Sequence, residues 1–144
     1  NSQSEIPPDQ ILEHELIHSM TQQADGFGFR TKDGTGKGLN EAFTQLLVLL
    51  RRNPSMKYSD LALALSNQSL KTLYGKEVMA LAAVLGLTEM GDSPITQEEL
   101  AKFYFSRGEE ERSIKRNLFM INILSKVPQN FYNNAYNILS KLAK

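Results

Sequence analysis

The stretch PDQILEHELIHSMTQQ, residues Pro8–Gln23, contains the residues that decide how this chain folds and what it can bind. Proline is favoured at the first position of a helix, and the acidic Asp9 complements the positive end of the helix dipole. Apolar residues then recur at helical spacing, at Ile11, Leu12, Leu16, Ile17 and Met20. We therefore predict a first helix from about Pro8 to Gln23.

The five residues His14-Glu15-Leu16-Ile17-His18 form an H-E-x-x-H motif on this helix. Residues four apart share a helix face, so the two imidazoles can bind one Zn²⁺ from adjacent turns. Glu15 is angularly offset from both histidines, which suits it to act as general base on a water rather than as a ligand. Taken alone, the motif could also occur by chance on a surface helix, with its His and Glu side chains solvated and no metal bound.

A second helix is predicted over Leu39–Arg52, within GLNEAFTQLLVLLRR. Its apolar residues occupy too many faces for a surface helix, which indicates a buried one. Asn53-Pro54 ends it. The glycine-rich segment between Asp25 and Gly38 predicts a loop or a short β-hairpin, which lets the chain reverse between the two helices.

A catalytic zinc usually has three protein ligands and keeps one position for water. The chain contains two histidines and no cysteine, so the third ligand must be a carboxylate. Glu41 on the second helix is the best candidate, 41 − 18 = 23 residues after His18. Glu41 could also be a first-turn acid that follows Asn40 as a helix N-cap, and this role is compatible with metal binding.

HELIH followed by GLNEAFTQ resembles the gluzincin group of metallopeptidases, the thermolysin-like class, in which a second helix carries an N-E-A motif. The resemblance covers roughly residues 9–50 and implies that Glu41 is the third zinc ligand. The later stretch LYGKEVMALAAVLG is similar to the helical segment that follows the site in small bacterial zincin-like proteins. The resemblance implies a zinc peptidase that cleaves a peptide or protein substrate, with Glu15 as general base.

The chain departs from the gluzincin pattern in two ways. That pattern has an Asp four residues after the ligand Glu, which orients a zinc-binding histidine, and this chain has Gln45 there. Gln can accept a hydrogen bond from a zinc-binding histidine, but it carries no charge. It should therefore raise the basicity of that histidine less than an Asp would. No third His is present to stabilise an oxyanion, so we assign that role by position to Tyr74 first, with Tyr58 and Arg30 as further candidates.

The rest of the chain predicts more helices, which makes the fold mainly α, a single zincin-like helical domain over residues 1–144. The expected segments are Asp60–Ser66, Tyr74–Leu85 closed by Gly86, a helix to about Arg107 opened by a capping box at Thr96 and Glu99, Glu109–Val127, and a last helix from Pro128. Gly108 separates two of them.

Composition excludes several classes of protein. Sixteen basic residues balance sixteen acidic ones among 144, so no overall charge favours nucleic acid. No apolar run is long enough for a membrane span. The first residues lack the features of a signal peptide, and we expect a mature form or a fragment of a longer protein. The absence of cysteine is compatible with a secreted or cell-surface protein, but compartment and oligomeric state stay open.

An alternative to the enzyme is a catalytically inactive zincin-like module that binds or interacts but does not cleave. Zincins usually have a sheet before the active-site helix, and only about a dozen residues precede HELIH here. The intact Glu15 favours the enzyme, because a module used only for binding has no need of a general base. A purely structural zinc site is disfavoured, because such sites mostly use thiolates.

Overall fold

The computed structural model describes residues 6, 8–20, 22–23, 26–27, 29–31, 33–91, 94–105 and 112–144, with the side chains of 20, 22, 23, 26, 27, 30, 31, 112 and 113 left out. The described chain is mainly helical, as predicted. Its helices are α1 (Pro8–Met20), α2 (Lys37–Arg52), α3 (Tyr58–Ser66), α4 (Gly75–Thr88), α5 (Gln97–Phe105), α6 (Arg112–Leu124), the 3-10 turn η2 (Gln129–Phe131) and α7 (Tyr132–Ala143). None of the described helices has the length and apolar character that crossing a bilayer requires.

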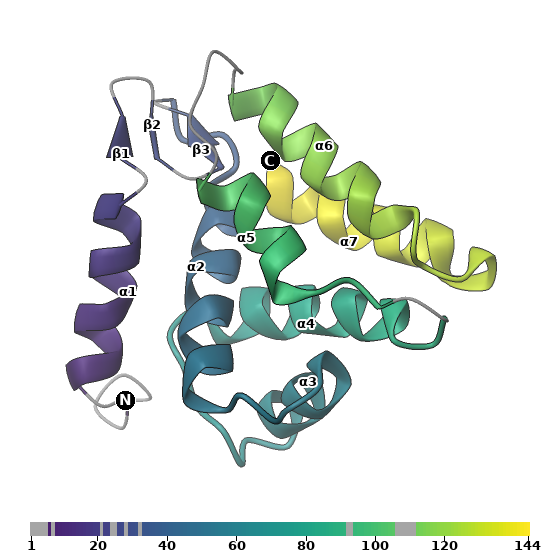
Figure 1. Ribbon diagram of the computed structural model, residues 1–144, viewed down its shortest axis with the longest axis horizontal. Helices are drawn as coiled ribbons and strands as arrows, with labels where there is room; N and C mark the ends of the chain where they lie inside the picture. The colour runs from purple at the N-terminus through teal and green to yellow at the C-terminus, as the bar shows by residue number, and fades with distance from the viewer. Residues whose placement is uncertain are drawn as a thin grey trace.

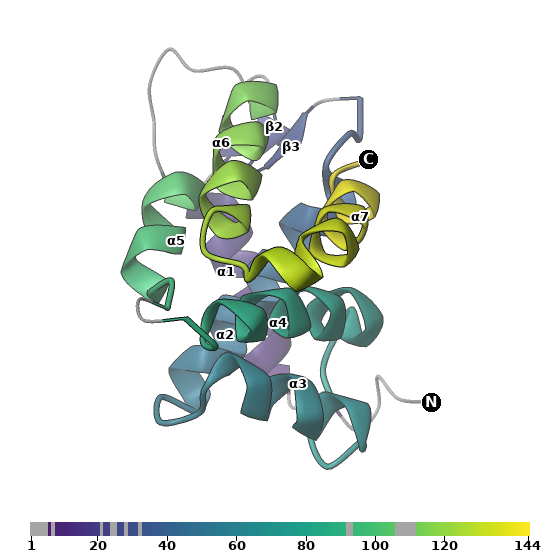
Figure 2. The same ribbon diagram turned by 90° about the vertical axis from the view of Figure 1, so that its right-hand side faces the viewer.

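Helix α2 lies at the centre of the fold (Figure 1). It contacts α1 on one side and α4 and α7 on the others, and the view turned by 90° shows the same arrangement (Figure 2). Residues 39–50 are all buried, as the sequence predicted for this helix. The polar side chains among them are Asn40, Glu41, Thr44 and Gln45, whose spacing places them on one stripe of the helix. Three of these four bond to side chains of α1.

The glycine-rich segment contains three two-residue strands. The sequence predicts either a loop or a short β-hairpin here. The strands are β1 (Gln22–Gln23), β2 (Gly26–Phe27) and β3 (Arg30–Thr31), antiparallel in the order β1-β2-β3. The first helix ends at Met20 and not at Gln23, because Gln22 and Gln23 pair with β2.

The turn from β3 into α2 requires glycine at position 36. Gly36 has φ +84°, and an added Cβ would lie 2.3 Å from the Phe29 carbonyl oxygen and 2.7 Å from Arg116 Cδ. The Arg116 guanidinium donates from Nη1 to the same carbonyl at 2.9 Å. Helix α6 therefore holds the segment that aligns the start of α2.

The predicted end of the fourth helix at Gly86 is wrong, because α4 continues to Thr88. Gly86 lies where α4 crosses α3, and a Cβ there would come within 3.2 Å of the Ser59 backbone. The glycine serves close helix packing and not helix termination. The capping box at Thr96 is confirmed, since Glu99 N donates to Thr96 Oγ1 at 3.2 Å and Thr96 N donates to Glu99 Oε1 at 3.4 Å. Gly108 lies outside the described residues.

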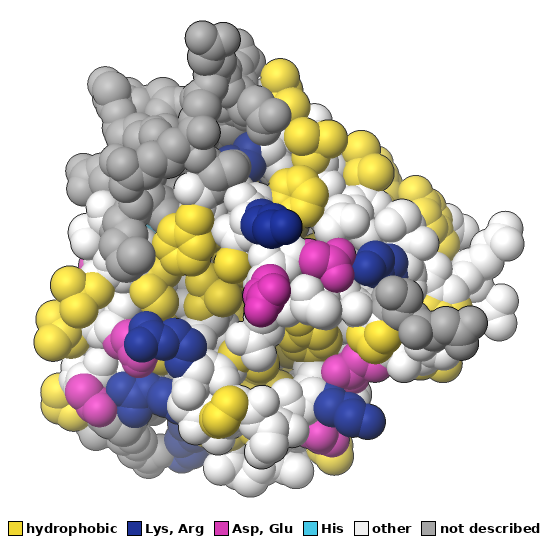
Figure 3. All heavy atoms as spheres, in the orientation of Figure 1, with side chains coloured by type: hydrophobic (Ala, Val, Ile, Leu, Met, Phe, Trp, Pro, Cys, Tyr) yellow, Lys and Arg dark blue, Asp and Glu magenta, His cyan; other side chains and the backbone are white. Residues whose placement is uncertain are grey.

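Four aromatic rings fill the core between α2, α5 and α6: Phe29, Phe43, Tyr104 and Phe119. The ring centroids of Phe29 and Phe119 are 4.5 Å apart. The buried Lys115 closes this cluster by donating from Nζ to the Tyr104 carbonyl at 2.5 Å. On the opposite face, α6 leaves Ile114, Leu118 and Ile121 exposed, and hydrophobic atoms follow the upper edge of the molecule over this helix (Figure 3).

Candidate metal centre

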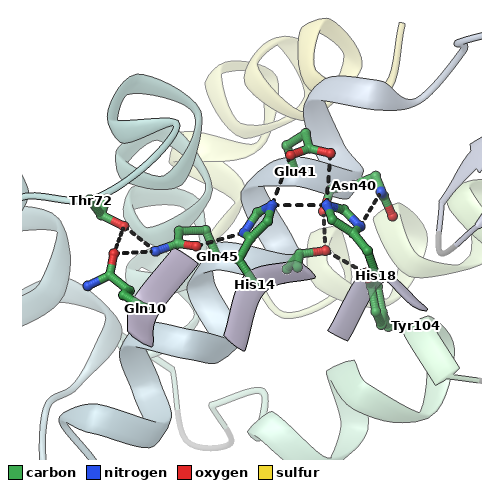
Figure 4. A network of polar contacts seen from close by, with 9 residues as sticks. Gln10, His14, His18, Asn40, Glu41, Gln45, Thr72 and Tyr104 are labelled. Atoms are coloured by element: carbon green, nitrogen blue, oxygen red, sulfur yellow. Dashed lines mark hydrogen bonds and ion pairs between the residues drawn. The ribbon is translucent and has the colours of Figure 1, made fainter. Parts of the chain in front are cut away.

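Helices α1 and α2 bring His14, His18 and Glu41 together (Figure 4). His14 Nε2 lies 3.0 Å from Glu41 Oε2, and His18 Nε2 lies 2.9 Å from Glu41 Oε1. The two Nε2 atoms are themselves 2.9 Å apart. One nitrogen of each imidazole and one carboxylate oxygen of Glu41 therefore lie within 4.8 Å of one another, close enough to bind one ion.

The donor atoms of this triad fit a divalent metal. Electron-pair donors this close together are stable only when a cation, either a proton or a metal ion, lies among them. Around a tetrahedral zinc, nitrogen and oxygen ligands at about 2.0–2.1 Å from the metal lie about 3.3 Å from one another. The observed separations are within a few tenths of an ångström of that value. Two imidazoles and one carboxylate are also the donor set of a catalytic zinc site that keeps a position for water.

Burial strengthens the electrostatics of the triad. His14 is 1% exposed and Glu41 is 5% exposed. Burial alone would raise the pKa of Glu41, but hydrogen bonds to His14 and His18, the charge of His18 and the Tyr74 hydroxyl together lower that pKa well below its usual range. Glu41 is therefore a carboxylate at neutral pH, ready to bind a cation.

The second ring nitrogen of His14 is held by Gln45, the residue that replaces the Asp of the gluzincin pattern. His14 Nδ1 donates to Gln45 Oε1 at 2.7 Å. The amide nitrogen of Gln45 donates to Gln10 Oε1 at 2.6 Å and to Thr72 Oγ1 at 2.5 Å. A proton on Nδ1 leaves the Nε2 lone pair of His14 directed at the centre of the triad.

Asn40 connects His18 to the turn that follows β2. Its Oδ1 accepts from the Phe29 amide at 2.9 Å, and its Nδ2 lies 3.3 Å from His18 Nδ1. The interpretation of Asn40 as an N-cap is wrong, because α2 begins three residues earlier, at Lys37 after Gly36. Asn40 is instead fully buried inside the helix, and Thr44 Oγ1 donates to its carbonyl at 2.7 Å.

Tyr74, the first candidate for the oxyanion role, lies beside the triad. Its ring stacks on His14 with centroids 5.6 Å apart and planes at 23°. Its backbone has the left-handed φ of 54°, which is strained for a side chain of this size and directs the residue from the start of α4 toward α1. Burial, the hydrogen bond to Glu41 and the charges of Glu41, Glu15 and Glu77 raise the pKa of Tyr74 to about 12. The hydroxyl therefore stays protonated and can donate.

Of the two other oxyanion candidates, Tyr58 makes its hydrogen bond elsewhere. Tyr58 donates its hydroxyl to the Ile95 carbonyl at 2.9 Å and connects α3 to the segment before α5. Arg30 lies in β3, and its side chain is outside the described part of the structure. Glu15 occupies the exposed side of α1, near enough to Tyr74 for its charge to contribute to the pKa of the tyrosine.

Sequence reasoning missed Gln10, Asn40 and Thr72 as partners of the site. Gln10 could have been found, since it lies four residues before His14 on the same helix face. No sequence signal indicates Thr72. Comparison of the chain with known protein families, with curated proteins and with solved structures found no match. The functional inference therefore depends on the motif and on the geometry of these residues.

Proposed function

We propose that this protein binds one Zn²⁺ through His14, His18 and Glu41 and hydrolyses peptide bonds as a zincin-like metallopeptidase. The observation that carries the proposal is that the Nε2 atoms of His14 and His18 lie 2.9 Å apart and each lies 2.9–3.0 Å from an oxygen of the Glu41 carboxylate. The spacing of His14 and His18 predicts that they share a helix face, and Glu41 is the best carboxylate candidate for a third ligand. Their side chains meet in space although 23 residues separate the second from the third.

The chemistry follows from the residues around the triad. When bound, zinc would polarise a substrate carbonyl and lower the pKa of a water from ~15.7 to about 7. Glu15 would act as the general base that takes one proton from the attacking water and then delivers it to the leaving amine nitrogen. Its exposed position on α1 suits a base that must meet an incoming peptide.

Tyr74 supplies a hydrogen-bond donor beside the metal ligands. Its hydroxyl is protonated at neutral pH and can donate to the carbonyl oxygen as that oxygen gains negative charge. Tyr74→Phe removes this donor and keeps the ring that stacks on His14. We expect kcat at saturating zinc to fall by about 10²–10³-fold.

The proposal is tested by comparing Glu15→Gln with wild-type protein on a fluorogenic peptide library after zinc loading. We expect the variant to keep its zinc and to lose about 10²–10⁴-fold in rate. Glu13→Gln is the matched control, because Glu13 lies on the same helix and pairs with Arg52 at 3.5 Å outside the triad. A wild-type protein that holds zinc but cleaves no member of the library would favour the inactive binding module.

A further inference from the structure

The Gln45 side chain takes part in a closed ring of hydrogen bonds behind the metal ligands (Figure 4). Both hydrogens of its amide nitrogen are used, one toward Gln10 Oε1 at 2.6 Å and one toward Thr72 Oγ1 at 2.5 Å. Thr72 in turn donates its hydroxyl hydrogen to Gln10 Oε1 at 3.2 Å. The ring joins α1, α2 and the segment between α3 and α4.

The orientation of the Gln45 amide decides which nitrogen of His14 can bind a metal. With the amide oxygen toward His14, the ring carries its proton on Nδ1 and presents a lone pair at Nε2. With the amide turned over, its NH₂ group would face Nδ1, and a neutral His14 would then carry its proton on Nε2. A carboxylate at this position would accept from Nδ1 in either orientation, so a glutamine needs an additional constraint that an aspartate does not.

We propose that Thr72 and Gln10 are positioning residues that hold the Gln45 amide in the one orientation that leaves His14 Nε2 available to the metal. The inference deepens the proposed function and rests on the metal site assigned there. Gln45 is fully buried and Gln10 is 4% exposed, so neither amide can exchange these partners for bulk water. A turned-over Gln45 amide would place its oxygen against Gln10 Oε1, leaving two buried acceptors face to face.

Thr72 is the member of the ring that is most informative to change. Thr72→Val keeps the shape of the side chain and removes both the acceptor for Gln45 and the donor to Gln10. Thr72→Ser keeps both functions. Thr88→Val is the matched control, because Thr88 is a buried threonine whose Oγ1 donates to Leu85 O at 2.6 Å and accepts from Ile95 N at 3.4 Å, both outside the ring.

The experiment measures zinc affinity by competition with a chelating dye, alongside thermal unfolding. Outer hydrogen-bond partners of metal ligands typically contribute 10–100-fold to metal affinity, so we expect Thr72→Val to weaken zinc binding by at least roughly 10-fold. Thr72→Ser and Thr88→Val should bind zinc as the wild type does. In a Gln45→Leu background, Thr72→Val should cause no further loss, because Thr72 acts through Gln45.

A spectroscopic readout separates orientation from general destabilisation. Long-range ¹⁵N–¹H spectra report which imidazole nitrogen of His14 carries the proton. At equimolar zinc we expect Nδ1–H in wild type and Thr88→Val, and a fraction with the proton on Nε2 in Thr72→Val. If Thr72→Val does not fold, Gln10→Met removes the shared acceptor and should produce the same changes.

Two results would overturn the inference, and they differ. Unchanged zinc affinity and an unchanged His14 proton position in folded Thr72→Val would refute the role of Thr72 and leave the metal site intact. A wild-type protein that binds no zinc would refute the proposed function and this inference with it.

Discussion

Helix α2 is buried by polar contacts on one side and by apolar contacts on the others. The side toward α1 is polar, and hydrogen bonds connect its Glu41 and Gln45 to His14 and Gln10. The sides toward α4 and α7 are apolar, with Leu46, Leu49 and Leu50 among the least exposed residues of the protein. One helix thus belongs both to a polar site and to an apolar core.

The apolar sides of α2 supply stability, and the polar side supplies geometry. Apolar burial is non-directional and contributes about 25 cal/mol per Å², whereas a typical hydrogen bond contributes only about 0.5–1.5 kcal/mol net but fixes orientation. Helix α1 buries Ile17 and otherwise relies on polar contacts, including the ion pair of Asp9 with Arg52 at 3.0 Å. We infer that the apolar side supplies most of the stability of the fold, and that the polar side fixes the positions of the α1 side chains.

The largest expected effect lies on the apolar side. Leu81 is fully buried in α4, and Leu81→Ala should lower the free energy of unfolding by about 2–5 kcal/mol, because it removes apolar contacts and leaves a cavity. Zinc affinity should not change. Leu63→Ala on the neighbouring helix, where the side chain is 65% exposed, is the control and should have little effect in urea denaturation. Equal losses in both variants would contradict the separation of the two regions.

An effect of similar size is expected from metal on the polar side. At a free zinc concentration about 1,000 times the dissociation constant, zinc should raise the free energy of unfolding by about 4 kcal/mol. His18→Ala removes one ligand and should abolish this gain in differential scanning calorimetry. The comparison fails if zinc stabilises wild type and His18→Ala to the same extent.

A third effect concerns the hydrogen bonds that connect the two regions. Thr44 Oγ1 donates to the Asn40 carbonyl and also contacts the Tyr104 hydroxyl in the aromatic core. Thr44→Val should cost about 1–3 kcal/mol by leaving buried polar groups unpaired. Tyr104→Phe should cost less in the Thr44→Val background than in wild type, and strict additivity in chemical denaturation would show that the two hydroxyls do not interact.

The smallest effect is expected at the surface, away from both regions. Lys126 donates to Glu99 at 3.2 Å, and hydrogen bonds to Lys126 and Thr96 lower the pKa of Glu99 below 4.5 despite the opposing effect of burial. The carboxyl is half-exposed, so Glu99→Gln should cost under about 1 kcal/mol. Because the folded pKa is lowered, this contribution is present above the unfolded pKa near 4.5 and disappears as pH falls through the folded pKa. A cost that persists unchanged at pH 2 would contradict this cause.

The sequence predicted those features of the fold that depend on local spacing. The buried helix α2, the placing of His14 and His18 on one face of α1 and the capping box at Thr96 each follow from residues close together in the chain. The end of α1 and the continuation of α4 through Gly86 could not be predicted, because strand pairing and helix crossing decide them. Local propensity contains no information about such tertiary contacts.

The residues of the candidate site also fall into those that the sequence could predict and those that it could not. The grouping of His14, His18 and Glu41 could be predicted, because a metal site needs particular atoms at particular spacings and the sequence offers few candidates. Thr72 could not be predicted, because it reaches Gln45 from a segment 27 residues away and threonine is common in turns. Only its position in the sequence suggests Tyr74 for the oxyanion role. Its placement over His14 depends on a left-handed backbone conformation that no local sequence pattern predicts.

The most direct test of the α1–α2 metal centre is the zinc content of the purified protein after zinc loading and desalting, measured by elemental analysis beside Glu41→Gln. The variant keeps the shape of the side chain and removes the charge that binds the cation. We predict about one zinc per chain in the wild type and a marked loss in Glu41→Gln. A wild-type protein without zinc, or a variant with the same zinc content as the wild type, would contradict the account.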